Sequence, residues 1–487
     1  MSALLLVVFC SATLHNGFRV TFGDTRISAT SVWRVVVLLL VTVGVRHALV
    51  RRPSWPADAR QRAQRFWRDP ATRVAWATSW STRVTVLVAA YFATLIIGYP
   101  SGAAAPVTEH KWLNLPAQWD AMWYLSIAKD GYRYDPELVG YQNVAFFPAY
   151  PMLMRTGGAL LGAQGRPESD ETYPEMSERS ELSWLWAGML ISLWSFFLAQ
   201  RYLFRLGREL VPPLRLAGHT AGVAVSASRG ASLDEPATRA LVLLAAFPFA
   251  LFFSAVYTEA LFLLASLGAF YHYRHREWIQ AALWGALAGL ARPNGCFLSV
   301  PLALIGIALA RQTPGRRWDV GTLMIGGLVA AAPGLAMLAH TAWLYGLTGE
   351  WFVWAQAQKA WGREYLGIQE STARFFELLQ SKGPDHLTRA WLFAFLNAVA
   401  ALGALACCWP VARRIGLPYA VFVLLNLAPP LFAGGFMSTG RMVSTLFPVF
   451  LYLGWRLSPA ACLQWAAIGL LLQGAFAAMH FTWRPLV

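Results

Sequence analysis

Apolar runs of about twenty residues dominate the chain, and short arginine-rich or mixed polar segments separate them. A helix of this length crosses the ~30 Å hydrocarbon layer of a bilayer. The runs predict single spans over residues 31–49, 82–99, 184–204, 320–344, 389–410, 417–436, 441–456 and 462–481, after a short apolar first segment from Met1 to His15. Together with two apolar hairpins, they predict an all-α polytopic membrane protein with about 11–13 transmembrane helices.

The two hairpins, 240–273 and 278–311, are too long for one span and too short for two full ones. Each divides into helices of about sixteen residues, roughly 24 Å long at 1.5 Å per residue. We therefore expect both turns to lie below the outer surface of the membrane. The first hairpin contains one acid, Glu259, and Arg292 interrupts the second. Because a charge that faces lipid costs several kcal/mol, the two side chains either line a water-filled cavity or form a structural ion pair.

The arginines predict the orientation of the chain. Cytoplasmic loops carry an excess of Lys and Arg, and here arginines gather in 50–80 and 205–239. The loops 100–183 and 345–388 then face the extracytoplasmic side. Residues 148–163 are also apolar, but a span there would move 205–239 to the outside. We therefore predict an interfacial or re-entrant segment at 148–163.

Composition excludes several classes of protein. Charged residues make up only 13% of the 487 residues, against about 25% in soluble domains. The net charge of +15 comes from the loop arginines, and no basic stripe indicates nucleic-acid binding. The five cysteines lack disulfide or metal-ligand spacing, and no Walker or HExxH motif occurs, so we expect neither an ATPase nor a bound cofactor or metal. We divide the chain into an N-terminal part, 1–81, and a membrane domain, 82–487.

The candidate chemistry lies in the first outer loop, where Asp120 stands among aromatic residues in the stretch Gln118-Trp119-Asp120-Ala121-Met122-Trp123-Tyr124. A carboxylate there can act as general base for a hydroxyl that attacks a sugar, and a leaving phosphate requires an arginine or a metal. Arg441 starts an outer helix, where it either binds an anionic group or is an ordinary interfacial residue. Trp and Tyr rings stack on sugars, but they also anchor proteins at membrane interfaces. Trp119 is the one aromatic residue of this loop that we assign to sugar binding rather than to interface anchoring.

These motifs resemble those of a known family. The pieces are Trp119-Asp120 through Tyr132, Ala145-Phe146-Phe147-Pro148 to Pro151, Phe253 through Glu259, Arg292-Pro293-Asn294-Gly295, and Gly440-Arg441 with Phe447-Pro448. In their order, over residues 82–456, they are similar to the PIG-V family of GPI-anchor mannosyltransferases and its bacterial relatives, within the GT-C glycosyltransferase superfamily. The resemblance implies a GT-C fold, a polyprenyl- or dolichyl-phosphate-linked mannose donor, inversion at the anomeric carbon and Asp120 as the catalytic residue. It also implies a bacterial inner membrane with the active site on the periplasmic face.

We therefore predict a membrane mannosyltransferase that moves a sugar from a polyprenyl-phosphate donor to a glycolipid, glycan or protein acceptor. Asp120 is the expected base, and Arg292 or Arg441 is expected to stabilise the phosphate. The expected substrate-binding residues are Trp119, Trp123, Tyr132, Phe147, Tyr257, Glu259, Arg292, Asn294 and Arg441. Two rivals remain, a flippase or transporter of lipid-linked sugars and a noncatalytic subunit with the same fold. A transporter should show inverted repeats and charges near the midplane, whereas this chain shows no repeat and places its charges toward the outer side.

Overall fold

The structure is a computed structural model of the whole chain. It describes residues 18–22, 25–29, 55–103, 106–138, 140–163, 178–211, 232–311, 318–363 and 384–486, with a few isolated positions besides. The predicted first segment, Met1 to His15, and nearly all of the predicted span 31–49 lie outside these residues. An antiparallel hairpin, β1 (Phe18–Phe22) with β2 (Thr25–Ala29), precedes the helices.

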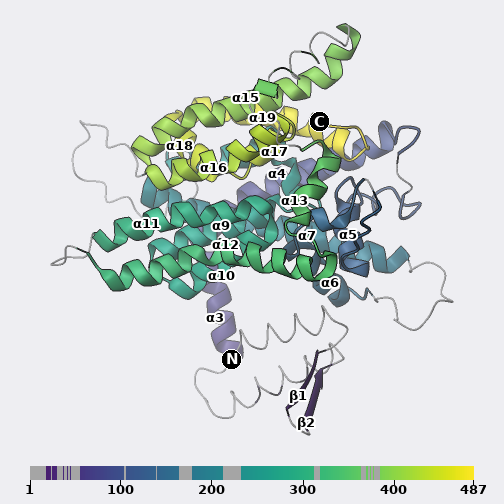
Figure 1. Cartoon of the computed structure of the whole chain (residues 1–487). Helices are drawn as coiled ribbons and strands as arrows, with labels where there is room; N and C mark the ends of the chain where they lie inside the picture. Colours follow the sequence, from purple (N-terminus) through teal and green to yellow (C-terminus); the bar gives the residue numbers. More distant parts are fainter. Residues whose placement is uncertain are drawn as a thin grey trace.

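Helices packed side by side form the body of the molecule (Figure 1). The long ones are α4 (Pro70–Ile96), α7 (Glu178–Leu210), α12 (Val320–Thr348), α15 (Pro384–Arg414) and α19 (Pro459–His480). Between them lie α8 (Pro236–Ala246), η2 (Pro248–Ser254), α9 (Glu259–Arg274), α10 (Trp278–Ala291), η3 (Pro293–Leu298), α11 (Ser299–Arg311), α16 (Leu417–Gly434), α17 (Thr439–Val443) and α18 (Phe447–Arg456), where η marks a 3-10 helix. Toward the right-hand end in Figure 1 lie α5 (Ala121–Asp130), α6 (Ala149–Leu160) and α13 (Val353–Ala357).

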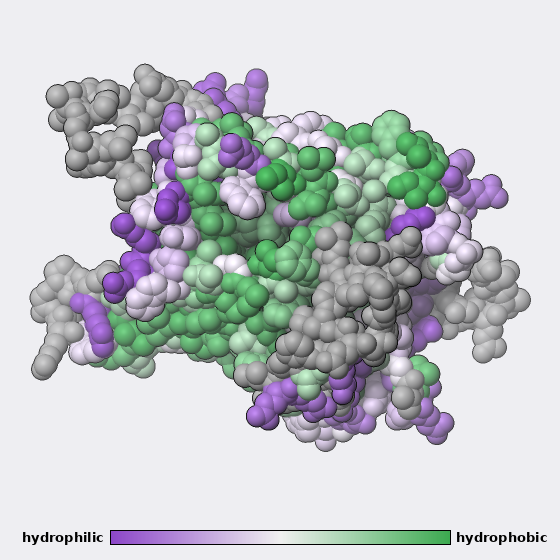
Figure 2. All heavy atoms as spheres, turned by 90° about the horizontal axis from the view of Figure 1, so that it is seen from above, coloured by the Kyte–Doolittle hydropathy of each residue, from purple (hydrophilic) through white to green (hydrophobic). Residues whose placement is uncertain are grey.

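Among the described residues, six helices are long and apolar enough to cross a membrane, or seven if the bent pair of α8 and η2 counts as one span. The six are α4, α7, η3 with α11, α12, the Phe393–Arg414 part of α15, and α19. Hydrophobic residues cover the middle of the face shown in Figure 2, and hydrophilic residues gather toward its two ends. This distribution is that of a protein surrounded by lipid. The predicted all-α polytopic membrane protein is confirmed.

Both short hairpins contain the predicted interruptions, but the first half of the first hairpin is two short helices rather than one of about sixteen residues. Helices α8 and η2 meet at an angle of 80°, because Pro248 has no N–H with which to continue the helix. Helix α9 then begins at Glu259 and has 16 residues. In the second hairpin, α10 ends after 14 residues, and Arg292 adopts an extended conformation (φ −155°, ψ 152°) before Pro293. The two predicted interruptions therefore place Glu259 and Arg292 at breaks in the helices.

Two differences between the predicted spans and the structure have a clear local cause. Helix α4 begins at Pro70 rather than at residue 82, because the Asp69 carboxylate caps it by accepting the Ala71 N–H at 3.1 Å. The predicted single span 441–456 is wrong, since α17 and α18 are separated by a turn. In that turn the hydroxyls of Ser444 and Thr445 donate to backbone carbonyls three residues earlier, at 2.6 and 2.8 Å. Such local bonds offer the backbone an alternative to a continuous helix.

Helix α6 lies in the segment 148–163, for which the arginine distribution predicted an interfacial or re-entrant position rather than a span. It has 12 residues, about 18 Å at 1.5 Å per residue, which is short of a span. It packs along α7, where the Tyr150 hydroxyl donates to the Gly188 carbonyl at 2.8 Å. Gly158 allows this approach, because a Cβ there would lie 2.0 Å from the Trp184 ring. The first outer loop is thus anchored on the membrane helices.

Candidate active site

Asp120 lies where the first outer loop enters α5, and a strained turn orients it. The preceding residue, Trp119, has a φ of 53°, a left-handed conformation that side chains other than glycine rarely adopt. The Trp119 indole N–H donates to the His480 carbonyl at 3.1 Å, and its ring lies 5.2 Å from that of Trp483. The Asp120 N–H donates to the Tyr257 hydroxyl at 3.4 Å. These contacts hold the turn and direct the carboxylate toward α9 and α17.

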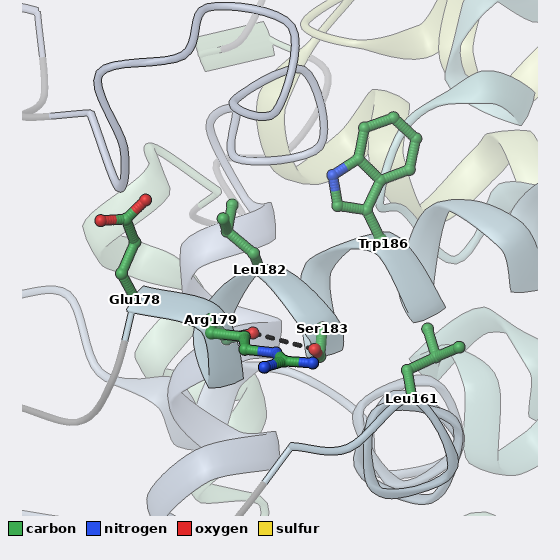
Figure 3. A pocket seen from close by; sticks show the side chains of 6 residues that line it. All are labelled: Leu161, Glu178, Arg179, Leu182, Ser183 and Trp186. Carbon is green, nitrogen blue, oxygen red and sulfur yellow. Dashed lines mark hydrogen bonds between the residues drawn. The ribbon is translucent and has the colours of Figure 1, made fainter.

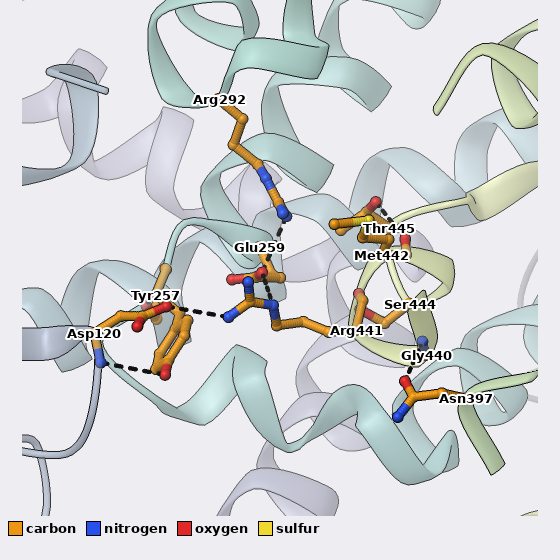
Figure 4. Close-up of polar contacts among 11 residues, drawn as sticks. Asp120, Tyr257, Glu259, Arg292, Asn397, Gly440, Arg441, Met442, Ser444 and Thr445 are labelled. Atoms are coloured by element: carbon orange, nitrogen blue, oxygen red, sulfur yellow. Dashed lines mark hydrogen bonds and ion pairs between the residues drawn. The ribbon is translucent and has the colours of Figure 1, made fainter. Parts of the chain in front are cut away.

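Four charged side chains from distant parts of the sequence form one continuous chain, which we call the charge chain (Figure 4). Arg441 Nη1 lies 3.2 Å from Asp120 Oδ2, and Arg441 Nε lies 3.1 Å from Glu259 Oε1. Arg292 Nη1 donates to the same Glu259 oxygen at 3.0 Å. The Glu259 side chain is 1% exposed and that of Asp120 is 26% exposed. The charge chain therefore runs from Arg292 through the buried Glu259 and then Arg441 to its most exposed end at Asp120.

A glycine brings Arg441 to this position. The Gly440 N–H donates to Asn397 Oδ1 at 2.7 Å, which fixes α17 against α15. A Cβ on Gly440 would lie 2.3 Å from the Phe249 ring, so only glycine permits this approach. The Arg441 guanidinium then lies 5.2 Å from the centre of the Tyr257 ring, in a cation–π contact.

The charge chain includes the ion pair between Glu259 and Arg292 that the sequence left as one of two interpretations. The pair does not satisfy every buried atom, however. Glu259 Oε2 has no hydrogen-bond partner within the described part of the chain, and Arg441 Nε is close to Glu259 without being aligned for a hydrogen bond. Buried polar atoms without partners are uncommon in folded proteins, and they often mark functional sites. The ion pair is therefore compatible with a substrate site.

Burial raises the pKa of the Asp120 carboxyl above its usual range. The guanidinium of Arg441 opposes this shift, the negative charge of Glu259 adds to it, and the more distant Arg363 also opposes it. A carboxylate with a raised pKa binds a proton more strongly and is a better general base. Asp120 thus combines accessibility with the basicity that proton abstraction requires.

Arg363 joins this site, although nothing in the sequence singled it out. It follows η4 (Gln358–Trp361) in the second outer loop. Burial, followed by the positive charges of Arg441 and Arg292, lowers the pKa of Arg363 to about 10, while Asp120 and Glu259 raise it. Its neighbours along the chain form no recognisable motif, so only its position near these charged groups reveals it.

Aromatic side chains from both outer loops meet beside the charged residues, and we call this cluster the aromatic wall. It consists of Trp123, Tyr141, Phe146 and Trp361. Trp123 stacks on Phe146 with ring centres 6.0 Å apart and planes within 15°. Trp361 meets Trp123 edge to face at 5.7 Å and Tyr141 at 4.8 Å. Because Trp123 lies three residues after Asp120 at the start of α5, the two share one side of the helix.

The remaining predicted residues lie in neighbouring contacts. The Tyr132 hydroxyl donates to the Phe146 carbonyl at 2.8 Å, and its ring lies 5.6 Å from His340 of α12. Phe147 is buried and meets the same histidine ring at 5.0 Å. Asn294 donates to Asn426 Oδ1 at 2.8 Å and ties η3 to α16. The structure thus gathers Trp119, Tyr257, Glu259, Arg292 and Arg441 around Asp120. It places Tyr132, Phe147 and Asn294 where they hold the surrounding elements.

An open pocket of about 500 Å³ lies elsewhere, between the end of α6 and the start of α7 (Figure 3). Its lining residues are Leu161, Glu178, Arg179, Leu182, Ser183 and Trp186. None of them belongs to the charge chain or the aromatic wall. The pocket therefore carries no part of the argument for a catalytic site.

Comparison with known proteins gives one result. A model of the family described as mannosyltransferase (PIG-V) matches residues 88–308. No curated protein and no solved structure matches the chain significantly. The matched segment contains Asp120, Glu259 and Arg292, and it ends before Arg363 and Arg441. Over residues 88–308 the chain is similar to the PIG-V family of mannosyltransferases.

Proposed function

We propose that this membrane mannosyltransferase takes mannose from a polyprenyl-phosphate donor and transfers it, with inversion, to a hydroxyl of a glycolipid, glycan or protein. Asp120 is the general base in this proposal. The observation that carries it is the charge chain, in which Asp120 is the most exposed member of a network of two carboxylates and two arginines. Such a network provides a base for the acceptor and positive charge for a phosphate.

The proposed step is a single displacement. The acceptor oxygen forms a bond to the anomeric carbon of mannose as the bond from that carbon to the phosphate oxygen breaks. The acceptor proton passes to the Asp120 carboxylate, and the lipid phosphate leaves with the electrons of the broken bond. Attack opposite to the leaving group inverts the configuration. Arg441 holds Oδ2 of Asp120 at 3.2 Å, and this contact also sets the direction of Oδ1. The arginines supply the positive charge, so we propose that the step uses no metal.

We further propose that the reaction takes place on the extracytoplasmic face. The site lies at the same end of the helix bundle as α5, α6 and α13, which belong to the two predicted outer loops. A different group of arginines surrounds the start of α4, where Arg201 and Arg205 pair with Asp69 at 3.1 and 2.6 Å. An excess of arginine is typical of the cytoplasmic side, which supports the assignment of the opposite end to the outside.

The test is Asp120→Asn in purified protein, with labelled polyprenyl-phosphate mannose as donor and a heat-treated total membrane extract, which contains lipids, glycans and proteins, as acceptor source. Loss of a general base lowers the rate by ~10²–10⁴-fold, so transfer should fall by that factor while the melting temperature stays unchanged. Asp130→Asn is the matched control. That acid ends the same helix and pairs with the largely exposed Arg133 at 3.5 Å, so this variant should transfer mannose like wild type.

Other outcomes identify the rivals. Full transfer by the Asp120→Asn variant contradicts the assignment of the base. If wild-type protein carries the donor across vesicle membranes and leaves the bond between sugar and phosphate intact, the protein is a transporter. If wild-type protein neither cleaves nor moves the donor, the noncatalytic alternative holds.

A further inference from the structure

We propose that Arg363 binds the phosphate of the lipid-linked donor, so that the second outer loop forms part of the donor site. This inference rests on the proposed function and deepens it. Residue 363 lies outside the segment that matches the family model, 88–308.

Of the three arginines near Asp120, Arg363 is the one that is free to bind a phosphate. Arg292 and Arg441 already pair with Glu259, which is 1% exposed, at 3.0 and 3.1 Å. Turning either toward a ligand would leave a buried carboxylate partly uncompensated, at a cost of several kcal/mol. Within the part of the chain that the structure describes, the Arg363 side chain has no ion pair or hydrogen bond of its own. It is therefore the arginine that a ligand can engage without disrupting the charge chain.

The total charge of the site also matches that of the proposed donor when Arg363 is included. The charged groups that act on Arg363 are Arg441, Arg292, Asp120 and Glu259, so the set of three arginines and two carboxylates carries one surplus positive charge. A polyprenyl-phosphate sugar is a phosphodiester with one negative charge. During transfer Asp120 gains a proton, and the surplus rises to two. At the same time the leaving group becomes a phosphate monoester, whose charge approaches −2 at neutral pH. The site and its ligand therefore remain balanced throughout the reaction only if Arg363 is counted.

Contacts between the two outer loops position Arg363 near Asp120. The Arg363 N–H donates to the Gln358 carbonyl at 3.2 Å, and Gly362 adopts a left-handed φ of 69° that turns the chain at this point. Gln358 Nε2 donates to the Ala145 carbonyl at 3.1 Å, and Trp361 packs into the aromatic wall against Trp123. Both contacts fasten the second outer loop to the first. Arg363 is consequently held next to the helix that Asp120 begins.

The chemistry of the side chain suits this role. Arginine presents a planar fork of N–H donors that matches the oxygens of a phosphate. The Arg363 side chain is half-buried, and charge interactions strengthen where water is partly excluded. A surplus charge of this kind stabilises the departing phosphate more than the bound diester, because only the former carries two negative charges.

The experiment measures binding of a polyprenyl monophosphate to the purified full chain, with the neutral polyprenol as comparison. Arg363→Gln should weaken monophosphate binding at least tenfold and leave polyprenol binding unchanged. Arg363→Lys keeps the charge without the fork, so its affinity should lie between those of wild type and the Gln variant. Arg133→Gln removes a largely exposed arginine of the first outer loop and should bind like wild type.

A pH series adds a readout that a purely structural role would not affect. Wild-type affinity for the monophosphate should rise as the pH passes through about 6, where the second phosphate proton dissociates. In Arg363→Gln this rise should flatten. If the Gln and Lys variants both bind like wild type, the inference is wrong while the proposed function stands. If wild type itself does not bind the monophosphate, the proposed function fails as well.

Discussion

Replacing Glu259 by glutamine tests whether the charge chain holds the site together. Glu259 Oε1 lies 3.0 Å from Arg292 and 3.1 Å from Arg441. At an effective dielectric constant of ~20, each contact corresponds to an attraction of roughly 5 kcal/mol. Mutual repulsion of the arginines and their residual solvation reduce the net effect. Breaking a buried ion pair by removing one partner costs ~3–5 kcal/mol, and we expect a loss of stability of this order.

The assay is reversible unfolding of the purified protein in detergent, monitored alongside mannose transfer. Glu181→Gln is the matched control, because this acid forms a single ion pair with Lys129 at 2.6 Å and its side chain is 21% exposed. Accessible pairs of that kind contribute ~0–1 kcal/mol. Removing the unpaired cation through Arg292→Met in the Glu259→Gln background should recover part of the lost stability. The reasoning is refuted if Glu259→Gln unfolds like the control and the second substitution recovers nothing.

Two further predictions concern the base and the glycine beside Arg441. Burial raises the pKa of Asp120, and a general base must be ionised to act, so on lowering the pH kcat/KM should begin to fall at a pH above the usual pKa of an aspartate. The folded state binds this proton more tightly than the unfolded state, so the contribution of Asp120 to stability should fall as the pH rises through the raised pKa. A fall in kcat/KM only at the ordinary aspartate pKa would contradict both expectations. Gly440→Ala should reduce transfer at least tenfold by driving a Cβ into the Phe249 ring, whereas Gly346→Ala, in a part of α12 with open space around the glycine, should leave transfer unchanged.

The sequence predicted the helical membrane architecture because apolar run lengths and isolated charges are local signals. The two short hairpins illustrate this, since one acid within 240–273 and the single arginine within 278–310 indicated their breaks. The break after α17 was missed. Its cause is the pair of hydroxyls at Ser444 and Thr445, which are too common in helices to predict a turn. The start of α4 was placed late because Arg73 interrupts the apolar pattern in its first turns.

The site was predictable where the residues sit in unusual sequence surroundings. Asp120 stands between tryptophans, and Arg441 follows a glycine whose small size the structure explains. Arg363 could not be found in this way. It comes from a loop of mixed composition, and its meeting with Asp120 depends on how Trp361 packs on Trp123. Side chains such as Phe147 looked like ligands of a sugar because a buried aromatic and an exposed one have the same sequence signature.

The anchoring of Trp119 has a consequence for biosynthesis. Its indole donates to the carbonyl of His480, in the last turn of α19, and Arg484 donates to the Gly98 carbonyl at 3.0 Å, near the end of α4. Asp120, the proposed base, is thus synthesised early, but its supporting turn is completed by residues made more than three hundred positions later. A chain still emerging from the ribosome, with α4 to α18 already inserted, lacks that support. Under the proposed function, activity should therefore appear only after α19 enters the bilayer, and incompletely assembled chains should not consume the proposed donor.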